Sequence, residues 1–75
     1  MTIIVCGAGT MGRGIAETSA RSGYDTILFD LEENVLQHAK IIIEKSLQQQ
    51  VISSRMNEDD KNATLQRIHF TYNIS

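Results

Sequence analysis

The spacing of apolar positions changes along this chain and separates two kinds of structural element. Residues 2–6 and 26–29 are short, nearly continuous apolar runs rich in β-branched side chains, which is typical of strands buried on both faces of a parallel sheet. Residues 10–22 and 31–52 carry apolar side chains three and four positions apart, which indicates helices with one apolar side. Residues 68–72 alternate apolar and polar side chains and predict a third strand.

Glycine and polar residues mark the expected ends of the helices. Gly23 follows the first helix at the position where a left-handed residue is expected. Asp30, with Glu33 three residues later, resembles a capping arrangement for the second helix. Asn57 is in a position to cap a shorter helix that ends at Arg67, because three acidic residues follow it in the first turn.

The predicted order of elements is therefore β-α-β-α-α-β, which belongs to the α/β class. Strands joined through helices pair in parallel, and right-handed crossovers arrange the three strands in the order 3-2-1. The chain contains no repeat, linker or low-complexity tract, so we expect no domain boundary within residues 1–75. This arrangement is one half of a doubly wound fold, whose other half would begin with a strand beside the first.

A glycine-rich segment, Gly7-Ala8-Gly9-Thr10-Met11-Gly12, joins the first predicted strand to the first predicted helix. Gly7 would permit a tight turn, Gly9 would let the backbone approach a diphosphate, and Gly12 would let the helix pack close to the strand. The free N–H groups at the helix start would favour the diphosphate charge, whereas the Met11 side chain is expected to pack against the sheet. Because the segment lies between a strand and a helix, it predicts a dinucleotide site in a Rossmann-type half domain.

Asp30 ends the second predicted strand, and its position supports the same site. It follows the last glycine of the segment by nearly the separation of about 20 residues that such sites show. A carboxylate there can accept hydrogen bonds from both adenosine ribose hydroxyls and would repel a 2′-phosphate, and residues 31–33 offer no arginine for one. The sequence therefore predicts NAD rather than NADP. An ordinary tight turn with an aspartate helix cap stays open as the alternative.

A triphosphate-binding loop is excluded by the residues that follow the glycine segment. Arg13 and Gly14 stand where such a loop has lysine and a hydroxyl residue, so no side chain would hold magnesium. The acidic residues elsewhere lie in the first turns of helices, where they suit the helix dipole, and their intervals do not predict a metal site.

Three further residues could suggest chemistry but are interpreted as structural or solvated. His38 and His69 have no carboxylate at a spacing that would orient either as a general base. Cys6 has no histidine placed to activate it and is expected to be a small buried side chain. We therefore assign no catalytic residue within this chain.

Charge and composition exclude several classes of partner. The net charge is −2 and the seven basic residues are scattered, which argues against nucleic acid or a membrane surface as partner. No apolar stretch approaches the roughly 20 residues that cross a bilayer. A single cysteine suits a reducing compartment, and a strand that starts at Thr2 leaves no room for a signal peptide. We expect a cytoplasmic protein.

Residues 7–16 (GAGTMGRGIA) closely resemble the start of bacterial 3-hydroxyacyl-CoA dehydrogenases, including the 3-hydroxybutyryl-CoA enzymes. The resemblance continues through residues 23–30, 43–47, 58–60 and 63–68, and so covers nearly the whole chain. It implies NAD-dependent oxidation of an L-3-hydroxyacyl-CoA to the 3-ketoacyl-CoA in fatty-acid metabolism, with the catalytic histidine and glutamate beyond the third strand. The chain would then be the N-terminal part of an NAD-binding domain in a homo-oligomeric enzyme, and would not turn over substrate alone.

The long helical segment between the second and third strands would lie beside the acyl-CoA in that family. By resemblance, Ser46 matches a position that contacts coenzyme A, whereas Ser53 stands where the family can carry a CoA-contacting lysine. Two alternatives stay open: another NAD-dependent dehydrogenase that acts on a free hydroxy acid, and a non-catalytic regulatory module that senses NAD. The long segment argues against both, because simple nucleotide-binding units need one crossover helix there.

Overall fold

The computed structural model describes residues 1–72 of the chain. The elements are β1 (Thr2–Cys6), α1 (Thr10–Arg21), β2 (Asp25–Phe29), α2 (Glu33–Ile52), α3 (Glu58–Arg67) and β3 (Ile68–Thr71). This order confirms the predicted β-α-β-α-α-β pattern, and the bounds differ from the expected ones by at most two residues.

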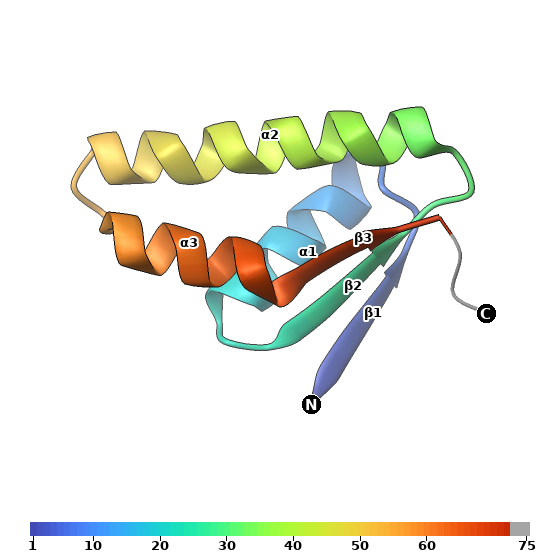
Figure 1. Cartoon of the computed structure of the whole chain (residues 1–75), viewed down its shortest axis with the longest axis horizontal. Helices are drawn as coiled ribbons and strands as arrows, with labels where there is room; N and C mark the ends of the chain where they lie inside the picture. Colours follow the sequence, from blue (N-terminus) through green and yellow to red (C-terminus); the bar gives the residue numbers. More distant parts are fainter. Residues whose placement is uncertain (73–75) are drawn as a thin grey trace.

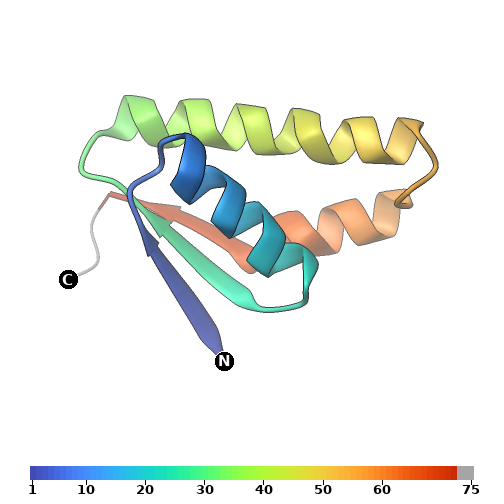
Figure 2. The same ribbon diagram turned by 180° about the vertical axis from the view of Figure 1, so that it is seen from behind.

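The three strands form one parallel sheet in the order β1-β2-β3, which is the predicted order read from the other edge. All three helices lie on the same face of this sheet (Figure 1). Right-handed crossovers that always advance in one direction place every helix on one side, so this layering follows from the topology. Figure 2 shows α1 crossing over the sheet below α2. The fold is the expected Rossmann-type half domain.

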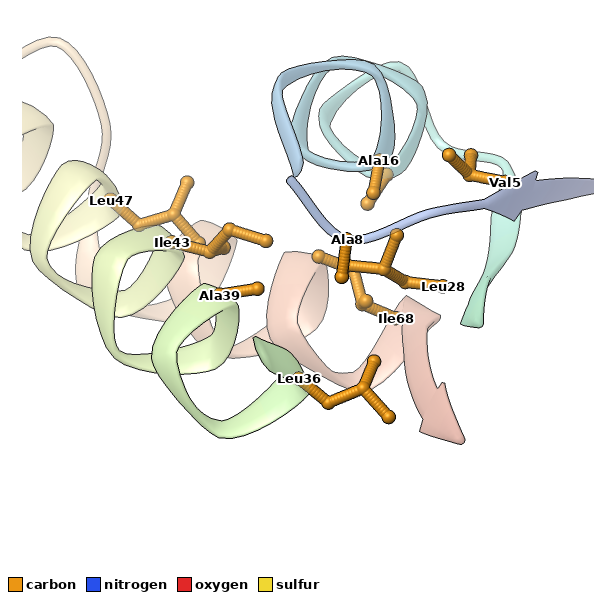
Figure 3. Close-up of a cluster of buried hydrophobic side chains, with 10 residues drawn as sticks. Val5, Ala8, Ala16, Leu28, Leu36, Ala39, Ile43, Leu47 and Ile68 are labelled. Carbon is orange, nitrogen blue, oxygen red and sulfur yellow. The ribbon is translucent and has the colours of Figure 1, made fainter. Parts of the chain in front are cut away.

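The core lies between that face of the sheet and the helices. Helix α2 contributes its buried stripe, namely Leu36, Ala39, Ile43 and Leu47. These side chains point toward Leu28 of β2 and Ile68 of β3 (Figure 3). Helix α1 buries alanines, Ala16 and Ala20, whose small side chains let it lie close to the strands.

The opposite face of the sheet carries no helix within residues 1–72, and this corrects two expectations. Val5 faces the helices and is 8% exposed, whereas its neighbour Ile4 is 60% exposed. The prediction that residues 2–6 are buried on both faces is therefore wrong, because the helices cover one face and β1 lies at the sheet edge. Cys6 shares the uncovered face and is exposed, so the expectation of a buried cysteine is also wrong.

Helix α1 corrects a third expectation. The Met11 side chain is 79% exposed and does not pack against the sheet. Ile15, one turn further along, is 47% exposed, whereas Ala16 and Ala20 are fully buried. The sheet-facing side of α1 is thus its small-residue side, and the larger apolar side chains of its first turns face outward.

The helix ends confirm two of the three predicted signals. Gly23 follows α1 with φ +97°, the left-handed conformation expected there. Asn57 caps α3, and its Oδ1 accepts a hydrogen bond from the Asp60 N–H at 2.7 Å. Asp30 does not cap α2, because that helix begins after Glu32 and has no side-chain cap. No helix among the described residues is both long and apolar enough to cross a membrane.

Candidate functional site

Two glycines of the segment at residues 7–12 are required by the backbone geometry itself. Gly7 has φ +103°, a conformation that side chains disfavour, and its N–H donates to the Phe29 carbonyl at 2.7 Å. A Cβ added at Gly12 would lie 1.7 Å from the Gly7 carbonyl oxygen and 3.3 Å from Cγ1 of Val5. These contacts confirm the tight turn at Gly7 and the close approach of helix to strand at Gly12.

Gly9 differs from the other two glycines because the chain itself does not require a glycine there. It is the N-cap of α1 with φ −72°, and a Cβ built on it would meet nothing within 4 Å. No side chain caps this helix, and its first turn contains no acidic residue. The first N–H groups of an α-helix, here those of Thr10, Met11 and Gly12, have no partner within the helix and point out of its positive end. This arrangement fits the charge of a diphosphate.

The Asp30 carboxylate lies beside the start of this loop and holds it. Its Oδ2 accepts a hydrogen bond from the Ala8 N–H at 2.9 Å, and its Oδ1 accepts one from the Glu32 N–H, also at 2.9 Å. The Ala8 bond first, and then the Glu32 bond, lowers the pKa of Asp30 below its ordinary value of 3.8. The group is therefore ionised near neutral pH. The structure thus brings together the loop and the acid that the sequence singled out.

Ala8 connects the site to the core. Its side chain is 1% exposed and lies near Leu28 (Figure 3). Its N–H is committed to Asp30, so Ala8 positions the carboxylate while the first turn of α1 keeps its own N–H groups for a ligand. The backbone of Asp30 is fixed in turn by its N–H bond to the Thr71 carbonyl at 3.2 Å. Sequence reasoning missed these links, because neither Ala8 nor Thr71 carries a distinctive functional group.

A hollow lies next to the carboxylate. Cys6, Gly7, Phe29, Asp30 and Leu31 line a cavity of about 230 Å³ at the ends of β1 and β2. In parallel sheets, ligands bind beyond the carboxyl ends of the strands, which is where this cavity lies. Its walls combine an aromatic ring, a leucine and the ionised Asp30, a suitable mixture for a ribose and a flat base.

Ser46 lies apart from this loop. It is in the second half of α2, and its hydroxyl donates to Oε2 of Glu17 on α1 at 3.1 Å. Glu17 also faces Arg21 at 3.8 Å. The Ser46 hydroxyl donates its one hydrogen to Glu17, and its oxygen keeps a lone pair that can accept a further hydrogen bond.

The two histidines are not placed as general bases. His38 and His69 are exposed, and neither is hydrogen-bonded to a carboxylate within the part of the chain that the structure describes. His69 lies on β3 in register with Ile27, on the sheet face that no described helix covers. Among residues 1–72, no three Cys, His, Asp or Glu side chains gather as a metal site would require.

Comparison with known proteins identifies relatives of this chain. The chain matches the family described as "3-hydroxyacyl-CoA dehydrogenase, NAD binding domain" over residues 2–75. A probable 3-hydroxybutyryl-CoA dehydrogenase of Deinococcus radiodurans is 40% identical over 70 residues, which cover 93% of this chain and 25% of that protein. The chain thus spans about a quarter of the length of this curated relative.

Two solved structures share the fold as well as the sequence. The crystal structure of 3-hydroxybutyryl-CoA dehydrogenase from Escherichia coli superposes with a TM-score of 0.94 at 32% identity, and covers 99% of this chain and 16% of that one. The (S)-3-hydroxybutyryl-CoA dehydrogenase of Ralstonia eutropha gives 0.92 at 30% identity, with 96% and 25% covered. These matches confirm the resemblance that residues 7–16 indicated.

Proposed function

Because this chain belongs to the family of 3-hydroxyacyl-CoA dehydrogenase NAD-binding domains, we propose that residues 7–12 and Asp30 together hold the ADP half of NAD. The Thr10, Met11 and Gly12 N–H groups would bind the diphosphate, and Gly9 would leave room for it. Asp30 would bind the adenosine ribose, held in place by Ala8.

The observation that carries this proposal is the pairing of uncapped amides with a fixed, ionised carboxylate. Each Asp30 oxygen accepts one backbone N–H, and a carboxylate oxygen has a second lone pair for a ribose hydroxyl. The two backbone bonds orient the group before a ligand arrives, so little freedom is lost on binding. The same charge would repel a 2′-phosphate, which supports NAD over NADP.

The activity of the whole protein is proposed from its relatives. We infer oxidation of an L-3-hydroxyacyl-CoA to the 3-ketoacyl-CoA. When bound, NAD⁺ accepts the hydride from the carbon that carries the hydroxyl, and the hydroxyl proton passes to a base. No described histidine is placed to act as that base, so this chain would bind the cofactor without completing the reaction. Ser46 would contact the coenzyme A portion through its free lone pair.

Other features of the proposal concern the protein's surroundings. Two relatives are named 3-hydroxybutyryl-CoA dehydrogenases, and their names support an acyl-CoA as the substrate of the complete enzyme. A homo-oligomeric protein is proposed from the resemblance to 3-hydroxyacyl-CoA dehydrogenases alone, because in a complete doubly wound fold a further strand would pair with β1. A single cysteine, Cys6, supports a reducing, cytoplasmic location.

The experiment compares two aspartates at opposite ends of the same strand. Asp30→Asn keeps the size of the side chain but removes its charge, and Asp25→Asn makes the identical change at the first residue of β2. NAD⁺ and NADP⁺ are titrated into each variant by calorimetry, with circular dichroism as the check on folding. We expect Asp30→Asn to weaken NAD⁺ binding about tenfold or more, because hydrogen bonds to an ionised group are lost. Asp25→Asn should leave the affinity unchanged.

Equal NAD⁺ affinity in the two variants would contradict the assignment of the ribose to Asp30. Tighter binding of NADP⁺ than of NAD⁺ by the unmodified chain would contradict the choice of cofactor. Gly9→Val provides an independent test of the diphosphate position, because a Cβ built at Gly9 meets no atom of the chain within 4 Å. Its melting temperature should change little while NAD⁺ affinity falls, and retained affinity would place the diphosphate elsewhere.

A further inference from the structure

A hollow lies at the opposite end of α1 from the glycine loop. This cavity has a volume of about 680 Å³ and lies between the end of α1, the α2–α3 turn and α3. Arg21, Arg55 and Arg67 line it, one from each of these elements, together with hydroxyl residues that include Thr18 and Ser22. The 12 residues of α1 separate it from the glycine loop by about 18 Å, at 1.5 Å per residue. Figure 2 shows this end of α1 beside α3. We refer to it as the arginine cavity.

Two of the three arginines that line the arginine cavity have no carboxylate partner among the described residues. Arg21 faces Glu17 at 3.8 Å, but neither Arg55 nor Arg67 has a carboxylate within 4.0 Å among the described residues. Asp60 is the one acidic residue in the lining. Three of the seven basic residues of a chain with net charge −2 therefore line one cavity. Such a concentration of guanidinium groups attracts an anion.

Arg67 is held through its side chain, and Arg55 is placed only through its backbone. Arg67 donates from Nη1 to the Ala20 carbonyl at 3.0 Å, which fixes its guanidinium at the end of α1 and leaves its other N–H groups for a ligand. The turn before Arg55 is equally defined: Ser54 has φ +61°, a left-handed conformation unusual for serine, and the Arg55 N–H donates to the Gln50 carbonyl at 2.9 Å. The backbone thus sets Arg55 at the cavity wall.

We propose that the arginine cavity binds a phosphate group carried by a small molecule, as a second anion site separate from the glycine loop. The flat guanidinium fork matches two phosphate oxygens at once, and it does so better than the point charge of lysine. Hydroxyls such as those of Thr18 and Ser22 can donate to the remaining oxygens. The phosphate could come from free inorganic phosphate or from the monoester end of a nucleotide such as coenzyme A. The second source rests on the proposed function; the site itself does not.

The experiment titrates the 75-residue chain with inorganic phosphate and, separately, with adenosine 3′,5′-bisphosphate. Binding is measured by calorimetry, and its position by NMR of the arginine Nε–H groups and backbone amides. Arg55→Gln is the test variant, because the Arg55 side chain makes no described hydrogen bond or ion pair that folding would need. Lys40→Gln is the matched control: it also removes one exposed positive charge, from a part of α2 outside the cavity lining.

We expect saturable binding, signal changes at Arg21, Arg55 and Arg67, and a loss of about tenfold or more in Arg55→Gln. Lys40→Gln should change the affinity less than about twofold, as expected for a screened, distant charge. Tighter binding of the bisphosphate than of phosphate would identify a nucleotide source, and equal binding would identify free phosphate.

Three results would overturn the proposal. One is no saturation at about 10 mM of either probe, ten times a millimolar Kd. Another is equal weakening by Arg55→Gln and Lys40→Gln. The last is a set of signal changes confined to residues 9–12, which would place the anion at the glycine loop. NAD⁺ titration of Arg55→Gln separates the two sites: unchanged NAD⁺ affinity beside lost phosphate binding leaves the proposed function untouched.

Discussion

The contact between Gly12 and the backbone of Gly7 makes the sharpest prediction about this fold. In Gly12→Ala, the new methyl carbon would lie 1.7 Å from the Gly7 carbonyl oxygen and 2.9 Å from its carbonyl carbon. Both atoms belong to backbone that is pinned by the Gly7 N–H bond to Phe29 and by its φ of +103°. No flexible side chain can move aside, so α1 must shift away from β1.

The magnitude follows from two opposing effects. Overpacking a well-packed contact costs up to about 3 kcal/mol, and more where backbone must move. Replacing glycine by alanine inside a helix returns about 1 kcal/mol through higher helix propensity. We therefore expect a net loss of at least about 2 kcal/mol, out of roughly 4–11 kcal/mol for a domain of 75 residues. For this size, the melting temperature should fall by about 8–16 °C.

Gly14→Ala is the matched control. It makes the same substitution two positions along α1, where an added Cβ would meet nothing within 4 Å. Only the propensity gain applies there, so stability should rise by up to about 1 kcal/mol. Thermal and urea denaturation, followed by circular dichroism, measure both variants. Shifts of the same sign in the two variants would refute the reasoning, because packing at Gly12 is the one difference between them.

Two further predictions concern Asp30 and the edge of the sheet. Because the Ala8 and Glu32 N–H groups lower the pKa of Asp30, its contribution to stability is complete above pH of about 3.8 and is lost as the pH falls through the lowered value. NMR of the carboxyl carbon and the Ala8 amide should show one shared midpoint below 3.8, and a midpoint at or above that value would contradict the bond. The chain should also associate through β1, which lies at the sheet edge and carries no charged residue from Thr2 to Cys6. Ile4→Lys should shift light scattering toward the monomer, whereas a monomeric profile of the unmodified chain at every concentration would disprove this expectation.

The order and bounds of the elements could be predicted because they depend on local periodicity. The apolar stripe of α2 and the Asn57 cap of α3 can both be recognised from residues that lie close together in the sequence. The covering of β1 could not be predicted in the same way. An apolar run shows that a strand suits burial, but which faces are covered depends on where the crossovers lie, and here all helices cover one face (Figure 1).

Asp30 shows how local and distant partners compete for one side chain. Its spacing to Glu33 indicated a helix cap, since Asp side chains commonly bond to nearby N–H groups. The structure satisfies one oxygen locally, through the Glu32 N–H, and the other through Ala8, 22 positions earlier. The helix N-cap lies at Glu32, two residues after the predicted position, and the distant bond had no signature in the sequence. The arginine cavity was hidden similarly, because Arg21, Arg55 and Arg67 are scattered in the sequence and line one cavity only in the fold.

The three glycines of the loop do not carry equal weight as evidence for a ligand. Gly7 and Gly12 are needed for a strand to turn into a closely packed helix, so their presence follows from the fold with or without a nucleotide. Gly9 has ordinary backbone angles and open space around its missing Cβ, so the folded chain gives no reason for glycine there. A residue that the fold does not require is better explained by what must approach it. The case for a diphosphate therefore depends on Gly9 and the uncapped amides after it, with Asp30 as the second, independent contact.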